Sequence, residues 1–226
     1  FTVDEQDVID NPLLSTMQVV MNEVGAAARR LIPDLVYATL LQNPQLADKV
    51  ACFDAARANL ATAALDQTSL DAGLAAIGNQ VLHDVQPGAV PDGTVDTLGD
   101  PIHTNLSPRY LMVPPAKVGA ARRLARDMAA GDGRDLVVRA ESRLSSTDLV
   151  DPLSDGLING NNKNWLLACP EQQAPGVALG LLNGKAEPTI RTAPLKGGEW
   201  GFCTDVQFYV AVALVDGRPL YWSQGE

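Results

Sequence analysis

The segment 107–128 reads SPRYLMVPPAKVGAARRLARDM, and it is the part of the chain that says most about the fold. Its apolar run from Arg109 to Val113 predicts a short strand. The strand must end at Pro114 and Pro115, because proline cannot continue a β ladder. Proline suits the first turn of a helix, so we expect a helix to follow directly. The segment therefore predicts a strand–turn–helix unit.

The predicted helix has an apolar stripe and a basic face. Ala120, Leu124 and Met128 recur at four-residue spacing, which places them on one stripe of the helix. Three basic residues face away from this stripe: Arg122, Arg123 and Arg126. The whole unit contains no nucleophile, no metal-ligand pattern and no phosphate-binding loop.

The composition is that of a folded chain with an acidic balance. Of the 226 residues, 46% are hydrophobic and 19% are charged, which is typical of folded domains rather than disordered segments. This length fits one large domain or two small ones. No run approaches the roughly eighteen apolar residues of a membrane span, so we predict none. The formal charge of −10 disfavours sequence-independent DNA binding, which needs a basic surface.

The three cysteines, Cys52, Cys169 and Cys203, do not form a recognisable pattern. An odd number without a CxxC spacing predicts reduced thiols in a cytosolic protein. The simplest interpretation is that they are buried and act as small apolar residues.

A long helix is predicted after Asn11 and Pro12, which supply a capping side chain and a proline at the first helical position. Apolar residues then recur at alternating steps of four and three, as on a buried helix face. They are Leu13, Met17, Val20, Val24, Ala27 and Leu31. Pro33 is expected to kink or break this helix, and a second piece runs to about Asn43.

Further along, a second helix and two loops are predicted. Thr68 and Asp71 resemble an acidic capping box and open a helix that runs to about Val81. The segment 84–108 is rich in Pro, Gly and Asp, which predicts a long loop. A turn-rich loop is also predicted for 151–164.

Strands are predicted in three further places. Phe1 and Val3 are strand-like positions at the start of the chain, and 136–140 predicts a short strand. The segment 206–214 alternates apolar residues with others over nine positions, which is longer than most strands. It therefore predicts one long strand that forms the backbone of a sheet.

The residue types that carry chemistry do not form a recognisable site. His83 and His103 lie near or inside the long loop, without Cys or His partners at metal-binding spacing. No GxSxG elbow surrounds any serine. Five oxygen-bearing residues suggest calcium by number, but their spacing is not that of an EF-hand. They are Asp151, Asp155, Asn159, Asn161 and Asn162. We predict no catalytic residue, no metal and no cofactor.

The strand–turn–helix segment closely resembles the central segment of tailed-phage major capsid proteins, in particular the Mu-like major head subunit group. Three other segments resemble the same family in collinear order. They are ACFDAARANLATAAL at 51–65, NWLLACPEQQAPGVALGLLNGKAEPTI at 164–190 and FCTDVQFYVAVALVDGR at 202–218. Each segment alone is mostly strand and turn chemistry, but four of them in sequence are specific.

This resemblance implies an α+β chain with the Hong Kong 97-type capsid fold. The segment 1–10 would be a remnant of the extended loop or N-terminal arm. A peripheral domain with the spine helix would comprise 11–104 and 191–226, and an inserted axial domain would comprise 105–190. The family normally has an arm and a full hairpin ahead of the spine helix. We therefore expect that an upstream segment either has been removed by proteolysis or is left out of this chain.

The resemblance also implies a function in the virion. The chain would be a major capsid protein that self-assembles in the bacterial host cytoplasm into pentamers, hexamers and an icosahedral shell. The shell would enclose double-stranded DNA without sequence-specific binding. The portal, the scaffold and the prohead protease are further candidate partners. Two alternatives stay open: an encapsulin-like compartment of the same fold, and a cytosolic α/β enzyme.

Charge pairs and loop tips are the expected intersubunit contacts. We hypothesise that an acidic arm meets basic residues of a neighbouring subunit, although a solvated surface is the simpler explanation for any one residue. The acids are Asp4, Glu5, Asp7 and Asp10, and the basic residues are Arg29, Arg30, Arg122 and Arg126. The resemblance alone places a tip with Asn161 and Lys163 at the axial end. Lys163 and Lys185 are conceivable in a lysine–asparagine cross-link, which we do not predict.

Overall fold

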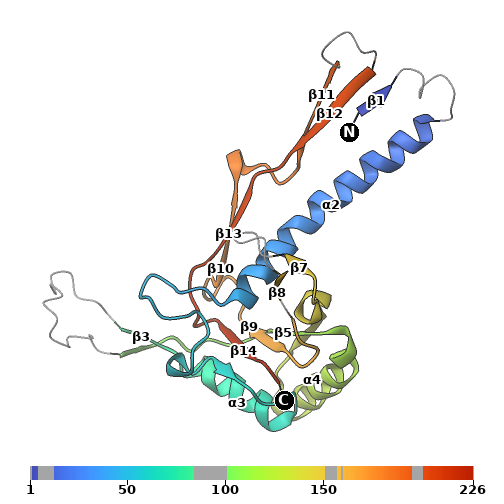
Figure 1. The fold of residues 1–226 in the computed structure, drawn as a ribbon. Helices are drawn as coiled ribbons and strands as arrows, with labels where there is room; N and C mark the ends of the chain where they lie inside the picture. Colours follow the sequence, from blue (N-terminus) through green and yellow to red (C-terminus); the bar gives the residue numbers. More distant parts are fainter. Residues whose placement is uncertain are drawn as a thin grey trace, which may run out of the picture. The chain divides into compact units, whose positions relative to one another are not determined.

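The computed structural model describes residues 2–4, 13–83, 101–150, 157–158, 160–194 and 201–225 (Figure 1). The chain divides into two compact units. The larger unit comprises 37–178 and 214–226, and the smaller unit comprises 1–36 and 179–213. These boundaries differ from those predicted for the peripheral and axial domains, which stay a prediction.

A five-stranded sheet forms the centre of the larger unit. Its strands lie in the order β2, β14, β9, β5 and β6. Their bounds are Leu60–Ala61, Leu220–Ser223, Trp165–Ala168, Tyr110–Val113 and Val137–Ala140. Strand β9 is antiparallel to both neighbours, whereas β5 and β6 are parallel, as are β2 and β14. The C-terminal strand β14 therefore belongs to the same sheet as the strand of the opening segment.

Two helices, α3 (Gln67–Gly78) and α4 (Val118–Asp132), pack against this sheet side by side (Figure 1). One hydrophobic cluster joins them to β5, β9 and β14, with Leu111, Trp165 and Leu167 fully buried. Helix α3 lies very close to the sheet, because a Cβ added at Gly73 would stand 3.0 Å from the Tyr221 ring. The helices and the sheet thus form a two-layer core.

The strand–turn–helix unit is present as predicted, with a correction to its apolar stripe. Strand β5 ends at Val113, a 3₁₀ turn at Pro115–Lys117 follows, and α4 begins at Val118. The buried residues of α4 are Ala121, Ala125 and Met128, whereas Ala120 and Leu124 are only half-buried. Alanine is small and allows the helix to approach the sheet closely. The residues that face the core therefore lie one position after the predicted Ala120 and Leu124.

The start and the end of α3 both differ from the prediction. Asp66 is the cap: its carboxylate accepts the Ser69 N–H at 2.7 Å, and the Ser69 hydroxyl accepts the Asp66 N–H at 3.0 Å. Thr68 and Asp71 therefore lie inside the helix. The helix ends at Gly78, because Val81–His83 forms strand β3 instead.

Several short elements complete the larger unit. Strand β3 pairs antiparallel with β4, and β7 pairs with β8. The bounds of β4, β7 and β8 are Pro101–His103, Leu149–Val150 and Leu157–Ile158. Two 3₁₀ turns lie at Ala55–Arg57 and Ser142–Ser145. The predicted loops 84–108 and 151–164 thus contain short strands where they are described.

Helix α2 runs unbroken from Leu13 to Gln42, as thirty residues. The prediction was a kink or a break at Pro33. Pro33 lies inside the helix and does not end it, so a break is wrong, and a kink stays a prediction. Proline removes one main-chain hydrogen bond, and the many remaining bonds of so long a helix maintain it. The predicted end near Asn43 is confirmed. The predicted cap at Asn11 and Pro12 lies outside the described residues.

Hydrogen bonds attach the end of α2 to the larger unit. The Asn43 side chain donates to the main-chain oxygen of Phe53 at 2.8 Å and accepts the Phe53 N–H at 2.7 Å. The Phe53 ring meets the Trp222 ring edge-on, with centroids 5.3 Å apart. Six residues before Asn43, the Tyr37 hydroxyl donates to the sulfur of Met112 at 3.3 Å. The last turns of α2 are thus fixed on β5 and β14.

The smaller unit contains the first part of α2 and two narrow sheets. A three-stranded antiparallel sheet has the order β1, β12 and β11, and a two-stranded sheet joins β10 to β13. The bounds of β1, β10, β11, β12 and β13 are Thr2–Asp4, Val177–Leu181, Thr189–Pro194, Gly201–Gln207 and Val210–Leu214. A 3₁₀ turn follows β10 at Leu182–Gly184.

The long strand predicted for 206–214 is interrupted. Strand β12 ends at Gln207 and β13 begins at Val210, with Phe208 and Tyr209 between them. The interruption has a clear reason, because β12 pairs with β11 whereas β13 pairs with β10. Alternating polarity does not reveal such a change of partner.

Candidate assembly surfaces

The described side chains of the smaller unit do not form a buried hydrophobic core. None of its described side chains is buried, whereas the larger unit contains all the buried hydrophobic residues. Four of its large hydrophobic residues are strongly exposed: Leu179, Leu182, Ile190 and Tyr209, at 45, 55, 51 and 59%. A two-stranded ribbon or a single open sheet is marginally stable in water without a covering layer. The architecture of this unit therefore calls for a partner surface.

A shallow hollow lies among these exposed residues. Its volume is about 160 Å³, and residues at the β10–β11 turn and the β12–β13 junction line it. Leu182 and Tyr209 supply apolar surface, whereas Lys185, Glu187 and Arg191 supply charge. The Leu182 N–H donates to the Tyr209 oxygen at 3.5 Å and joins the two sides. An apolar patch with a charged rim is typical of protein–protein interfaces.

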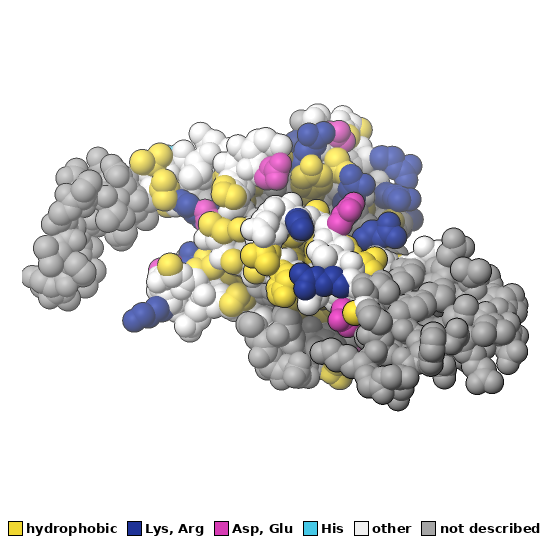
Figure 2. All heavy atoms as spheres, turned by 90° about the horizontal axis from the view of Figure 1, so that it is seen from above, with side chains coloured by type: hydrophobic (Ala, Val, Ile, Leu, Met, Phe, Trp, Pro, Cys, Tyr) yellow, Lys and Arg dark blue, Asp and Glu magenta, His cyan; other side chains and the backbone are white. Residues whose placement is uncertain are grey.

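The outer face of α4 is basic, as predicted. Arg122, Arg123 and Arg126 are exposed, and the Arg126 Nε donates to the Arg122 main-chain oxygen at 3.2 Å. Three more exposed arginines lie beside α4 and the strands it covers: Arg109, Arg134 and Arg139. Within the described part of the chain, none of these six has an ion pair. Figure 2 shows Lys and Arg side chains gathered on part of the visible face.

The other arginines of the larger unit are paired with acids. Arg57 bonds to Asp48, Arg143 to Glu141 at 2.9 Å, and Arg218 to Asp216 at 2.6 Å. These pairs stabilise turns within the unit. The six unpaired arginines are therefore a distinct set that is available to a partner.

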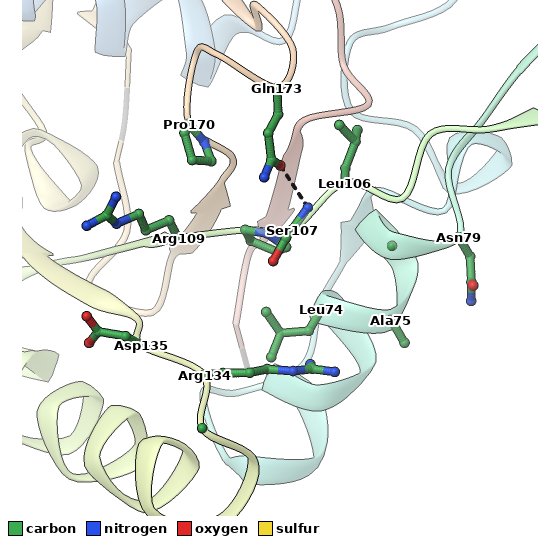
Figure 3. Close-up of a pocket in the computed structure, with 13 residues that line it drawn as sticks. Leu74, Ala75, Asn79, Leu106, Ser107, Arg109, Arg134, Asp135, Pro170 and Gln173 are labelled. Atoms are coloured by element: carbon green, nitrogen blue, oxygen red, sulfur yellow. Dashed lines mark hydrogen bonds between the residues drawn. The ribbon is translucent and has the colours of Figure 1, made fainter.

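A larger cavity of about 680 Å³ opens where α3 and α4 both end (Figure 3). Arg109, Arg134 and Asp135 line it together with apolar and amide groups, and the Gln173 Oε1 accepts the Ser107 N–H at 2.9 Å. Ser107 has no histidine near it among the lining residues. The cavity offers hydrogen bonds and charge, but it does not assemble a nucleophile with a base.

The predicted tip with Asn161 and Lys163 forms a tight, exposed turn of the larger unit. The Lys163 N–H donates to the Asn161 side chain at 3.0 Å, and the Asn161 N–H donates to the Leu144 oxygen at 2.8 Å. The Lys117 ammonium donates to the Lys163 oxygen at 3.0 Å. Burial lowers the pKa of Lys117, and the charge of Lys163 lowers it further. The turn is thus rigidly supported.

A comparison with protein families shows the kind of protein that carries these surfaces. A family profile described as phage capsid protein matches residues 1–223. The chain belongs to the phage capsid protein family. The predicted function, a bacteriophage capsid protein with a structural role, is thereby confirmed, and the family indicates a location in the virion.

The fold of this capsid protein is similar to that of a known shell protein. It resembles the holo-SrpI encapsulin complex from Synechococcus elongatus PCC 7942, solved by cryo-electron microscopy, with a TM-score of 0.51 and 12% identity. The likeness covers 100% of this chain and 71% of the encapsulin chain. No curated protein matches the chain. No helix in the described residues is long and apolar enough to span a membrane.

The charge contact predicted for the capsid protein's acidic arm stays a prediction. Asp4 lies in β1, opposite Gly201, whereas Glu5, Asp7 and Asp10 lie outside the described residues. On α2, Arg29 and Arg30 are exposed. The Arg29 Nε donates to the Gly25 oxygen at 3.3 Å, which leaves the rest of its guanidinium group available.

The thiols have the buried character that the sequence predicts, where they are described. Cys52 and Cys169 are free and buried, and burial raises the pKa of each to about 11. The side chain of Cys203 lies outside the description. No group of three or more His, Cys, Asp or Glu among the described residues is placed to hold a metal ion.

Sequence reasoning missed the exposed apolar patch of the capsid protein. Leu179, Leu182 and Tyr209 occur in strand-like runs, and periodicity does not show whether a second layer covers such strands. It also missed Arg109, Arg134 and Arg139, which are scattered in the sequence. Their separation by eight to thirteen residues from the nearest helix arginine conceals that the fold places them around α4.

Proposed function

We propose that the protein is a major head subunit that assembles with copies of itself into pentamers, hexamers and a closed icosahedral shell. The observation that carries the proposal is the smaller unit, in which no described side chain is buried. Exposed apolar side chains such as Leu179, Leu182 and Tyr209 gain stability when apolar surface of a second copy covers them. Membership of the phage capsid protein family supports a second copy as this partner.

The finer assignment follows from the resemblance of the sequence. We propose the Hong Kong 97-type fold, with α2 as the spine helix, and a place in the Mu-like major head subunit group. The fold likeness to an encapsulin supports a shell architecture of this type. The shell would assemble in the host cytoplasm and enclose double-stranded DNA, with portal, scaffold and prohead protease as further partners.

An encapsulin-like compartment is the second candidate, because the similar structure is an encapsulin. The two functions differ in what the shell contains. Nuclease-protected DNA inside purified particles supports a phage head, whereas a co-purifying protein cargo without DNA supports a compartment. The enzyme alternative has lost its support, since the family is structural.

The exposed patch of the smaller unit allows a direct test of self-assembly. Replacing both Leu182 and Tyr209 with Asp is expected to prevent the formation of rings and shells, because charge would enter an apolar contact. The control is Leu157→Asp, which alters a leucine of the larger unit that is also more than half exposed. Negative-stain electron microscopy counts the particles. Normal shells from the double variant would contradict a role of this patch in assembly.

A further inference from the structure

The larger unit has positive charge on one side of its sheet. The segment 107–140, which forms β5, α4 and β6, contains seven Lys and Arg against three Asp, a formal charge of +4. The chain as a whole carries −10. The six unpaired arginines described above all lie in this segment. The fold does not require this positive charge on one side of the sheet, because the six arginines are exposed and do not pack in the core.

The order of the strands separates this basic side of the sheet from the side that carries helix α3, where two carboxylates are exposed. Strands β6 and β2 are the two edges of the sheet. Helix α4 contacts β5 and β6, whereas α3 contacts β14, the neighbour of β2. The outer faces of α4 and α3 therefore belong to opposite halves of the same sheet.

Two carboxylates at the start of α3 are exposed and have no cationic partner in the described part of the chain. Asp66 caps the helix through the Ser69 N–H, and Asp71 accepts a hydrogen bond from the Gln67 side chain at 3.1 Å. These hydrogen bonds hold both carboxylates in place. The hydrogen bonds to Asp66 also lower its pKa, so it stays charged at neutral pH.

We infer that the arginine face of α4 in one copy docks against the acidic start of α3 in the next copy. The contact is heterologous, since each copy presents a different surface to each neighbour, and such contacts close into rings. Arg122 and Arg126 are the central cations, and Asp66 and Asp71 are the acceptors. This inference rests on the proposed self-assembly and names the surfaces by which neighbouring copies recognise each other.

A second copy fits this face better than DNA does. Asp127 and Asp135 are exposed among the arginines, and the remainder of the chain is strongly acidic, so phosphates would meet repulsion at short distance. A second copy, in contrast, supplies carboxylates that are already held in fixed positions. Complementary charge of this kind sets the register and the choice of partner.

Two variants with opposite defects test the contact. Variant A carries Arg122→Glu and Arg126→Glu, and variant B carries Thr68→Arg and Asp71→Arg. Each variant alone would bring like charges together at every ring contact. We expect each alone to need about tenfold more protein than the wild type to assemble. Circular dichroism checks that both remain folded, as expected for exposed positions.

The decisive experiment is to mix variants A and B. In an alternating ring, the new Glu of A faces the new Arg of B, and the native Arg of B faces the native Asp of A. An equimolar mixture is therefore expected to recover assembly into even-numbered rings, which misfolded variants would not do. Mass photometry and negative-stain microscopy measure ring size and yield.

Each other outcome overturns the inference in a distinguishable way. Normal assembly of A or B alone would remove the contact and leave the proposed self-assembly intact. If variant A formed normal shells without packaged DNA, the arginines would bind DNA rather than a second copy. Failure of the mixture to recover, with both variants folded, would also reject the contact. A wild type that never assembles would reject the proposed function and this contact together.

Discussion

The side-chain amide of Asn59 donates to the main-chain oxygen of Gly217 at 2.9 Å, across 158 positions of the sequence. The same amide donates to the Cys52 oxygen at 2.8 Å, and its oxygen accepts the Asp54 N–H at 2.9 Å. Asn59 is completely buried. It therefore ties the turn before β2 to the turn before β14. Gly217 makes this approach possible, because a Cβ there would overlap the Cys52 oxygen.

Replacing Asn59 with Ala is expected to lower the free energy of unfolding by about 3 kcal/mol, because buried main-chain groups lose their partners. Asn59→Asp should be similarly harmful, since a carboxylate oxygen would face two carbonyl oxygens. Urea unfolding followed by tryptophan fluorescence measures both effects. The exposed Asn162→Ala serves as control. Equal stability of the Asn59 variants and the wild type would show that the hydrogen bonds of Asn59 do not stabilise the fold.

The buried thiols predict slow alkylation and a loss of stability at high pH. With pKa values raised to about 11, Cys52 and Cys169 stay protonated at neutral pH. A raised pKa in the folded state contributes stability below the unfolded pKa near 9, and this contribution disappears as the pH rises toward 11. Iodoacetamide labelling with peptide mass spectrometry should label both residues rapidly only in urea. Rapid labelling of the native chain would show that they are accessible.

The capping arrangement of α3 gives a test that separates two neighbouring residues. Asp66→Ala should lower the melting temperature, because the Ser69 N–H loses its acceptor. Thr68→Ala should have little effect, since Thr68 lies inside the helix and is exposed. Because the pKa of Asp66 is lowered, its contribution should also disappear as the pH falls into the acidic range. A larger drop in melting temperature for Thr68→Ala than for Asp66→Ala would show that Thr68 is the cap, as the sequence predicted.

The acidic arm provides a test that depends on charge alone. Changing Asp4, Glu5 and Asp7 to Lys should impair shell formation while leaving the thermal unfolding of the chain unchanged. The expected cause is repulsion from basic residues of a neighbouring copy, such as the exposed Arg29 and Arg30. Electron microscopy and calorimetry measure the two effects separately. Normal particles from the triple variant would remove the arm from the list of contacts.

Local sequence chemistry predicted the parts of the fold that depend on near neighbours. Pro114 and Pro115 ended β5 and opened the turn before α4 as expected, because proline acts through its own ring and missing N–H. Asp66 was missed as a cap, since Thr68 offers the same chemistry two residues later. The helix-breaking effect of Pro33 was overestimated, because the sequence does not show how many main-chain hydrogen bonds a long helix retains.

Features that depend on distant partners could not be read in this way. The change of sheet at Phe208 and Tyr209 follows from which strands lie beside β12 and β13, and alternation of polarity contains no such information. The exposure of Leu182 could not be predicted for the same reason. The family resemblance nevertheless predicted the kind of protein, because it reflects the whole order of segments rather than any single contact.

Self-assembly is the central claim, and the most direct measurement of it is the mass of the purified chain in solution. Sedimentation velocity over a range of concentrations, with negative-stain microscopy of each fraction, should reveal rings and closed shells built from 23.9 kDa subunits. The exposed apolar surface of the smaller unit predicts that these grow with concentration and with salts that strengthen apolar contacts. A single 23.9 kDa species at every concentration would contradict the account.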